Sequence, residues 1–292
     1  MRMRATVAAV SGALALSALA VPAAQADSTA DSLLQRPTAA DVFGAEAHRS
    51  TARSAAALPT ITSVSVNGGK DVVVGTTTAK TFTVSVTATH ASGITDAFVE
   101  LWHGTDFDTY VDGALVQNQE YATCTAASAT KSTCKLTITA RPGYDDELVG
   151  YLYDNALAGS WKVNVAVLAN DGSVYQDTDY KTVKVQRLSK LTVNAAPEPV
   201  KKGATLTVTG KLTRADWEAE KYVGIPSGQS VALQFRKANS SAYSNVKGIK
   251  TTSGGALKTT VKAAADGYHR FNYKGITSTA ASVAAGDYVD VK

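Results

Sequence analysis

Apolar and polar residues alternate along most of the chain after Leu58, and short stretches rich in Gly, Ser, Asn and Asp separate the alternating runs. In an extended strand every second side chain points to the same face, so each run predicts a half-buried β-strand. In TFTVSVTAT, for example, Phe82, Val84 and Val86 share one face, and Thr and Ser residues occupy the other. The pattern therefore predicts an all-β protein.

The alternating runs fall into two groups that meet near residue 187. The first group, in residues 59–187, includes ITSVSVNGG, AFVELWHG, WKVNVAVLAN and YKTVKVQR. The second group, in residues 188–292, includes TLTVTGKLT, SVALQFRK, ALKTTVKA, YHRFNYKG and DYVDV. Many short strands with turn residues between them predict an antiparallel β-sandwich or a β-barrel. Because LSK (residues 188–190) leaves little linker, we expect the two sandwiches to be closely coupled.

Several local signals refine this outline. Asp171-Gly172 is typical of a hairpin turn, and so is the glycine pair Gly254-Gly255. Gly210 lies inside a strand pattern, which fits a bulge or a close packing point. Residues 145–157, DDELVGYLYDNAL, depart from the alternation, and their acidic first turn predicts a short helix.

The N-terminus has the pattern of a secretory signal peptide. Arg2 and Arg4 precede a run of Ala, Val and Leu that ends in Ala24-Gln25-Ala26, an A-x-A cleavage site. The run is shorter than the ~20 residues that a membrane-spanning helix needs. We therefore predict that residues 1–26 are a cleaved signal peptide and that no membrane insertion follows cleavage. The protein would be secreted and extracellular, either released or associated with the cell wall.

The segment of residues 27–58 is rich in Ala, Ser, Thr and Asp and lacks sustained hydrophobic periodicity. This composition predicts a flexible leader or a propeptide, with one short helix around Ala39 to His48.

Charge is divided unevenly between the two predicted sandwiches. Residues 27–187 hold 12 Lys+Arg against 18 Asp+Glu, and residues 188–292 hold 15 against 7. An acidic domain attracts cations, whereas a basic one attracts anionic cell-wall polymers or nucleic acid. Alternatively, the opposite charges could serve only to let the two domains dock onto each other or keep each other soluble. No nucleic-acid motif accompanies the basic charge, so we predict no nucleic-acid partner.

Wall or carbohydrate binding would use exposed aromatic residues together with basic ones. Trp161 alternates with valines and is predicted to lie in the core, whereas Trp217, near Tyr222, lies outside any alternating run and is expected at the surface. The basic residues of the second sandwich are spread over several predicted strands; they include Lys201, Lys202, Arg236, Lys237, Lys247, Lys250, Lys258 and Lys262.

Cys124 and Cys134 are the two cysteines of the chain. In an exported protein such a pair predicts one disulfide, which here would staple a hairpin at the base of its loop. A zinc site is disfavoured, because structural zinc sites use four ligands at tighter spacing.

The second half of the chain, from KLTVNAAPEPVKKGATLTVTGKLTRADW through SVALQFRK and ADGYHRFNYKG to AGDYVDVK, resembles a known module. It is similar to the C-terminal bacterial Ig-like domain of a family of small secreted proteins from high-GC Gram-positive bacteria. The signal peptide and the placement of the cysteines fit that family too. The resemblance implies an Ig-like β-sandwich and no established biochemical activity. Some members are named calcium-binding proteins, but the resemblance implies no ligand residues.

Five aspartates are the candidate calcium ligands. Asp106, Asp108 and Asp112 lie in GTDFDTYVDG, which lacks the glycine and glutamate positions of an EF-hand but could form a loop site. Asp177 and Asp179 are predicted to point to one face of a strand, about 7 Å apart. That pair could bind calcium only together with residues from another strand or loop. Calcium is the one cofactor that the sequence suggests.

No catalytic motif is present in the sequence, such as a nucleophile elbow, a zinc-binding H-E-x-x-H or a phosphate-binding glycine loop. The leading hypothesis is a secreted, non-enzymatic structural or binding protein with two tandem Ig-like sandwiches, whose basic second domain contacts an anionic cell-wall polymer. One alternative is an extracellular calcium-binding protein with its site in the first sandwich, and another is a hydrolytic enzyme.

Overall fold

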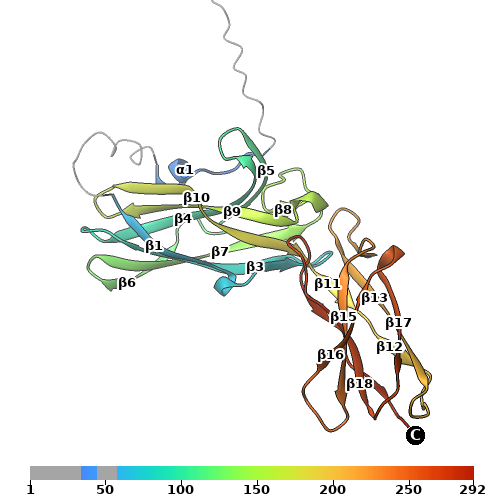
Figure 1. Ribbon diagram of the computed structural model, residues 1–292. Coiled ribbons are helices and arrows are strands. Elements are labelled where there is room, and N and C mark those ends of the chain that lie inside the picture. Colours follow the sequence, from blue (N-terminus) through green and yellow to red (C-terminus); the bar gives the residue numbers. More distant parts are fainter. Residues whose placement is uncertain (1–33, 45–57) are drawn as a thin grey trace, which may run out of the picture. The chain divides into compact units, whose positions relative to one another are not determined.

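A computed structural model describes residues 34–44 and 58–292 of the chain. The predicted signal peptide, residues 1–26, lies outside the described residues, as does His48. The described residues belong to one compact unit and form four β-sheets (Figure 1). The sheets pair into two tandem Ig-like sandwiches, so the predicted all-β fold class is confirmed. None of the helices in the described ranges has the length and apolar character needed to cross a membrane.

The first sandwich consists of two five-stranded sheets. One sheet has the order β1-β3-β7-β6, with β8 beside β7. Its strands are β1 (Thr60–Val66), β3 (Lys80–Thr89), β6 (Thr123–Ser128), β7 (Lys131–Pro142) and β8 (Tyr151–Leu152). The other sheet has the order β2-β10-β9-β4-β5. Its strands are β2 (Val72–Val74), β4 (Ile94–Asp106), β5 (Tyr110–Val116), β9 (Gly159–Ala169) and β10 (Val174–Arg187). Two single turns of 3-10 helix, η3 (Asn67–Gly69) and η4 (Asn155–Leu157), lie in the connections between strands.

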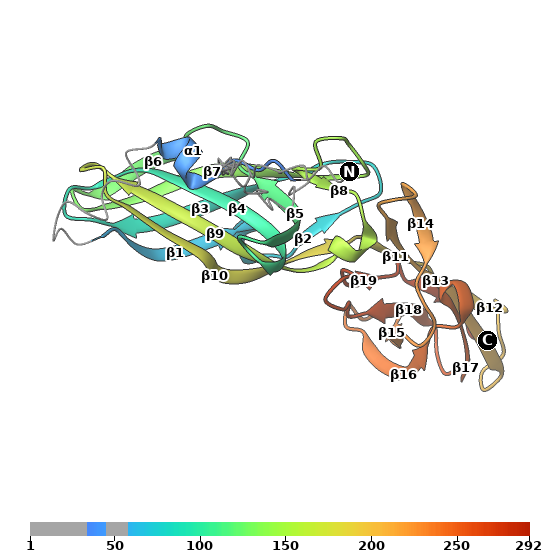
Figure 2. The same cartoon turned by 90° about the horizontal axis from the view of Figure 1, so that it is seen from above.

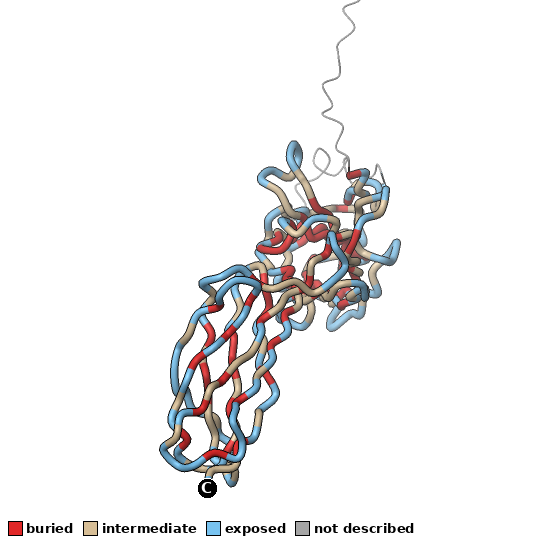
Figure 3. Tube along the Cα trace, turned by 90° about the vertical axis from the view of Figure 1, so that its right-hand side faces the viewer, coloured by how far each residue is buried: buried red, intermediate tan, exposed pale blue. Residues whose placement is uncertain are grey.

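Alternation along the strands places one face of each sheet in the core of the first sandwich. Phe82, Val84 and Val86 of β3 are all buried there, and Trp161 of β9 is closed to solvent, as predicted. Figure 3 shows the same alternation of buried and more exposed residues along individual strands of the described chain. On β4, Val99 joins this core, so the opposite face of the strand points outward.

That outward face is covered by the N-terminal segment of residues 34–44. Its short helix α1 (Ala39–Phe43) begins with a Thr38 cap. A helix was predicted around Ala39 to His48; α1 begins at Ala39 but ends at Phe43, and residues 45–48 lie outside the described residues. Ala39 is buried against Phe98 and Ala166. The prediction of a flexible leader over residues 27–58 is therefore wrong for residues 34–44, which pack on the sheet.

The second sandwich also has two sheets, seen from above in Figure 2. In one sheet β13 is the central strand. It contains β11 (Ser189–Leu191), β12 (Asn194–Ala196), β13 (Thr205–Asp216), β14 (Lys221–Gly224) and β17 (Ala256–Lys262). The other sheet has the order β16-β15-β18-β19, with β20 beside β18. It contains β15 (Ser230–Lys237), β16 (Ser244–Lys250), β18 (Gly267–Tyr273), β19 (Ser282–Val283) and β20 (Asp287–Val289).

Two glycine predictions have different outcomes. A Cβ on Gly210 would lie 2.2 Å from the carbonyl oxygen of Thr192 and 2.9 Å from the Phe271 ring, so the predicted close packing point is confirmed. Gly254-Gly255 is not a hairpin turn. It lies in η5 (Ser253–Gly255), which connects β16 to β17, and these strands belong to different sheets.

The predicted helix over residues 145–157 is absent from this described part of the chain. Leu148 and Gly150 adopt positive φ angles of 55° and 85°, which interrupt a helical path. Residues 151 and 152 then pair with β7, and Asp154 caps the single turn η4. The acidic start that suggested a helix therefore belongs to a loop.

Trp217 is buried rather than exposed, which corrects the prediction. It lies in the turn between β13 and β14, yet its side chain joins the hydrophobic core of the first sandwich. Its indole Nε1 donates a hydrogen bond to the carbonyl of Val74 at 3.4 Å. Nearby, the side chain of Arg187 forms an ion pair of 3.6 Å with Asp216. Residues from both sandwiches thus share one packed junction, as the short linker predicted.

Candidate functional site

The aspartates of the first candidate cluster lie in and beside the hairpin between β4 and β5. Oδ1 of Asp106 accepts hydrogen bonds from the Thr109 hydroxyl at 2.8 Å and from the backbone N–H groups of Thr109 and Asp108 at 2.9 and 3.0 Å. These bonds, with the Thr109 hydroxyl first, lower the pKa of Asp106. On β5, Oδ1 of Asp112 lies 2.6 Å from Nδ1 of His103 on the facing strand. These carboxylates stabilise the hairpin itself.

The second pair does not share the regular strand face that we predicted. Asp177 pairs with Val165 and Lys181 with Val163, so residues 178–180 bulge out of β10. Within the bulge, Oδ1 of Asp177 accepts a hydrogen bond from the backbone N–H of Asp179 at 3.0 Å. The bulge is anchored because the buried indole of Trp102 donates to the carbonyl of Thr178 at 2.6 Å.

Asp179 has a basic partner, since its carboxylate lies 3.3 Å from Nζ of Lys162. Within residues 34–44 and 58–292, no group of three or more His, Cys, Asp or Glu side chains is arranged to hold a metal ion. The calcium site formed by Asp106, Asp108, Asp112, Asp177 and Asp179 stays a prediction.

The predicted hairpin turn at Asp171-Gly172 is confirmed, and it packs against the β3–β4 turn through His90. Nδ1 of His90 lies 2.7 Å from the Ser92 hydroxyl, and Nε2 lies 3.8 Å from Oδ2 of Asp171. The three residue types match a Ser-His-Asp triad. However, Ser92 binds the histidine within its own turn, and 3.8 Å is too long for the orienting hydrogen bond. The contacts therefore join two turns at the end of the sandwich.

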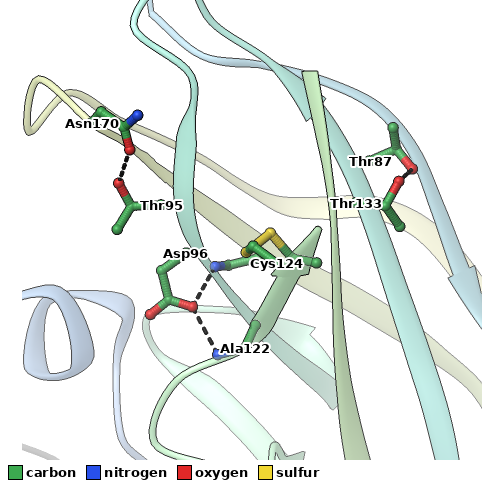
Figure 4. The surroundings of a disulfide bond; sticks show 9 residues. Thr87, Thr95, Asp96, Ala122, Cys124, Thr133 and Asn170 are labelled. Carbon is green, nitrogen blue, oxygen red and sulfur yellow. Dashed lines mark hydrogen bonds between the residues drawn. A yellow bond between two sulfur atoms is a disulfide. The ribbon is translucent and has the colours of Figure 1, made fainter. Parts of the chain in front are cut away.

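The predicted disulfide between Cys124 and Cys134 is confirmed. The two residues are register partners on β6 and β7. The strands stay paired beyond them as far as Ser128 and Lys131, so the disulfide lies within the hairpin and not, as predicted, at the base of its loop. Figure 4 shows its surroundings, where Oδ1 of Asp96 accepts the backbone N–H of Ala122 at 2.8 Å and so holds the chain entering β6. The Thr87 and Thr133 hydroxyls bond across the neighbouring strands at 3.0 Å (Figure 4).

The second sandwich carries a row of stacked tyrosine and arginine side chains on one sheet. Phe271 and Tyr273 of β18 point into the core, so Tyr268 and Arg270 point to the opposite face. Arg236 of β15 lies on the same face, because it is the register partner of Tyr268. We call the surface formed by Arg236, Tyr243, Tyr268, Arg270 and Tyr288 the tyrosine–arginine face.

Direct ring contacts connect all five residues of this face. The guanidinium carbon of Arg270 lies 3.6 Å from the Tyr243 ring centroid, and that of Arg236 lies 5.3 Å from the same ring. Arg236 also stacks on Tyr268 at 3.7 Å. The Tyr268 and Tyr288 rings, 5.2 Å apart, complete the row. The order along the face is Arg270, Tyr243, Arg236, Tyr268, Tyr288.

Hydrogen bonds orient the two guanidinium groups. Nε of Arg270 donates to Oε1 of Gln234 at 2.9 Å, and Nε2 of Gln234 donates in turn to Asn245 at 2.8 Å. Nη1 of Arg236 donates to the carbonyl of Ser240 at 2.9 Å. Among the described residues, neither guanidinium forms a salt bridge with a carboxylate. Two positive charges are thus held in place without an acidic partner.

From the sequence, Arg236 was predicted only as one of several basic residues spread over different strands, and the tyrosine–arginine face was not predicted. The alternation Tyr268, Arg270, Asn272 was visible as a polar face of one strand. The grouping depends on the pairing of β15 with β18 and on the position of Tyr243, neither of which local sequence reveals.

No protein-family model and no curated protein matches the chain. Solved structures with a similar fold include DIP-gamma IG1+IG2, at 13% identity and a TM-score of 0.22, covering 80% of this chain and 98% of that chain. A marsupial T cell receptor aligns at 11% identity and a TM-score of 0.35, covering 80% of this chain and 73% of that one. The D0-D1 domain of intimin aligns at 17% identity and a TM-score of 0.24, covering 78% and 98%. These likenesses say nothing of what this chain binds.

Proposed function

We propose that this is a secreted, non-enzymatic binding protein whose tyrosine–arginine face binds an anionic cell-wall polymer. The observation that carries the proposal is the continuous row of two arginines and three tyrosines, in which neither arginine has an acidic partner in the described chain. Guanidinium groups without a carboxylate partner favour phosphate or carboxylate ligands, to which they donate paired hydrogen bonds.

The shape of the face suits an extended polymer rather than a small molecule. Its residues come from β15, β18, β20 and the connection before β16, so the charges and rings follow one another across a sheet. Tyrosine rings supply flat apolar surface for sugar or polyol units, and the arginines bind the acidic groups between them. The basic net charge of residues 188–292 adds long-range attraction to a polyanion.

The location of the protein is inferred from two features. The N-terminal pattern of residues 1–26 directs a chain to export, and the Cys124–Cys134 disulfide is typical of an oxidising space outside the cytosol. Binding to the wall would keep an exported protein at the cell surface. The proposed resemblance to secreted proteins of high-GC Gram-positive bacteria, whose walls would supply the ligand, agrees with this assignment.

Co-sedimentation with purified cell walls tests the function. The full mature chain should pellet with intact walls at low salt and much less at high salt, because salt screens exposed charges. Walls stripped of their anionic polymers by acid extraction should lose most of the binding. Equal binding to intact and stripped walls would contradict an anionic ligand. No binding to either would contradict the function itself.

A further inference from the structure

The outer face of the sheet β2-β10-β9-β4-β5 contains a carboxylate that is closed to solvent. Glu100 lies on β4, on the same face as Phe98, and is 0% exposed. This face points away from the core of the first sandwich, where an antiparallel sheet ordinarily meets water. The cover is the chain's own N-terminal segment, Leu34–Phe43.

The carboxylate of Glu100 receives hydrogen bonds from two directions. Nη1 of Arg36 donates to Oε1 and Oε2, at 3.0 Å each. From within the sheet, Nδ2 of Asn164 donates to Oε2 at 3.1 Å, and Gln176 holds Asn164 through a bond of 2.9 Å. Side chains of β9 and β10 thus orient the acceptor independently of the segment.

The other contacts of Arg36 complete a socket for its guanidinium. Nη2 donates to the carbonyl of Phe107, and the guanidinium carbon lies 4.1 Å from the centroid of the Phe107 ring. A planar cation is therefore held by a carboxylate, a carbonyl and a ring face. A lysine ammonium could not satisfy all three with the same geometry.

Apolar contacts flank the socket on the helical side. Ala39 is buried against Phe98 and Ala166, and Val42 and Phe43 pack beside them. The helix needs no help from the sheet to begin, because Thr38 and Asp41 cap it reciprocally. The segment therefore presents an arginine and a short apolar helix face, and the sheet offers a matching surface for each.

The stability of the sandwich gives no reason for a glutamate here. Burial raises the pKa of Glu100, with Arg36 acting in the opposite direction, so the site is unfavourable for a carboxylate that lacks a cation. An apolar residue would cover the sheet at no electrostatic cost. A site that recognises an arginine, in contrast, needs a buried carboxylate that is already oriented toward the guanidinium.

We propose that this outer face is a peptide-binding site, specific for an arginine followed by a short apolar helix, and that Leu34–Phe43 is its intramolecular ligand. The site is separate from the tyrosine–arginine face and does not depend on wall binding. Cleavage of the chain between residues 44 and 58 would turn the segment into an exchangeable peptide. The vacated site would then accept the same segment from a second copy of the chain.

The test uses the full mature chain with a protease site inserted between residues 50 and 51. After cutting, we expect the N-terminal fragment to co-elute with the rest of the protein in gel filtration. A labelled peptide of residues 32–46 should exchange into the site, as measured by fluorescence anisotropy. The Arg36→Gln peptide should bind about 10- to 100-fold more weakly, as expected for loss of a charge-assisted hydrogen bond.

Variants of the protein provide the matched control. Glu100→Gln should weaken binding of the wild-type peptide, whereas Glu120→Gln, which removes an exposed carboxylate, should not. Thermal melting of the cut protein checks the fold. Loss of folded structure on cutting would overturn the proposal, because the segment would then be part of the core. Separate elution without saturable peptide binding, or equal binding of the Arg36→Gln peptide, would overturn it as well.

Discussion

The guanidinium of Arg270 stacks on the ring of Tyr243, with 3.6 Å between the guanidinium carbon and the ring centroid. Tyr243 lies between Arg270 and Arg236 and is therefore the residue that joins the two charges of the tyrosine–arginine face. A cation held on an aromatic ring gains only about 0.5–1 kcal/mol at an exposed site. The ring therefore acts mainly by helping the hydrogen bonds to Gln234 and Ser240 to hold both guanidinium groups in place.

Tyr243→Leu should therefore weaken wall-polymer binding by about 2- to 5-fold, the equivalent of one exposed cation–π contact. Titration of the full chain with purified polymer measures the change. Tyr144→Leu is the matched control, because Tyr144 is 70% exposed on the first sandwich, away from the face. The same loss in both variants would show that Tyr243 has no special role.

The disulfide should contribute measurably to stability without being needed for the fold. Replacement of Cys124 and Cys134 by alanine should lower the free energy of unfolding by up to about 3 kcal/mol, the chain-entropy value for a loop of this size. Reductant should have the same effect on the wild type in denaturant titrations and none on the double variant. A wild type that titrates with two free thiols would contradict the assigned bond.

Gly210 and Gly248 form a matched pair for a packing test. A Cβ at position 210 would meet a carbonyl oxygen at 2.2 Å, whereas nothing lies within 4 Å of a Cβ at position 248. Gly210→Ala should lower the free energy of unfolding by about 1–3 kcal/mol, as in other overpacked sites. Gly248→Ala should be neutral or stabilise by up to about 1 kcal/mol, because it restricts the unfolded chain. Equal denaturation midpoints would refute the close approach.

His269 should make the second sandwich less stable in acid. Burial lowers the pKa of His269, with Asp287 opposing the shift, and the side chain contacts the Phe235 ring. Below pH of about 6.5 the unfolded chain takes up a proton that the folded chain does not. Stability from this group is therefore complete above that pH and is lost as the pH falls through the lowered folded pKa, by at most about 1.4 kcal/mol per pH unit.

The variant His269→Gln isolates this contribution. It should be less stable than the wild type at neutral pH, yet its unfolding free energy should fall less steeply between pH 7 and pH 5. Parallel curves for the two proteins would show that His269 does not titrate differently in the folded and unfolded states.

Strand positions were predictable from sequence because a sandwich imposes a period of two. Phe82, Val84 and Trp161 point into a core that lies on one side of their sheet only. Apolar residues therefore occupy every second position of these strands, and this alternation is visible in the sequence. The turn at Asp171-Gly172 was predictable for a similar local reason, since the glycine there adopts φ of 83°.

Features that depend on distant residues were not predictable. Trp217 is buried because the core of the first sandwich receives it, and its own loop sequence holds no sign of that partner. The bulge at residues 178–180 separates Asp177 from regular pairing, and Trp102, far away in the sequence, anchors it. The contact of Arg36 with Glu100 spans 64 residues and needed the folded sheet to be visible.

Binding of a wall polymer by the tyrosine–arginine face is tested most directly by calorimetric titration of the protein with purified anionic wall polymer, using two double variants of equal charge change. Arg236→Gln with Arg270→Gln removes both charges of the tyrosine–arginine face. Lys258→Gln with Lys262→Gln removes two exposed charges from β17, in the other sheet. We expect the arginine variant to lose at least about 10-fold in affinity, as is typical of charge-assisted hydrogen bonds, and the lysine variant to lose only a few-fold. Equal losses in the two variants would show that net charge alone attracts the polymer, and would contradict a binding site on this face.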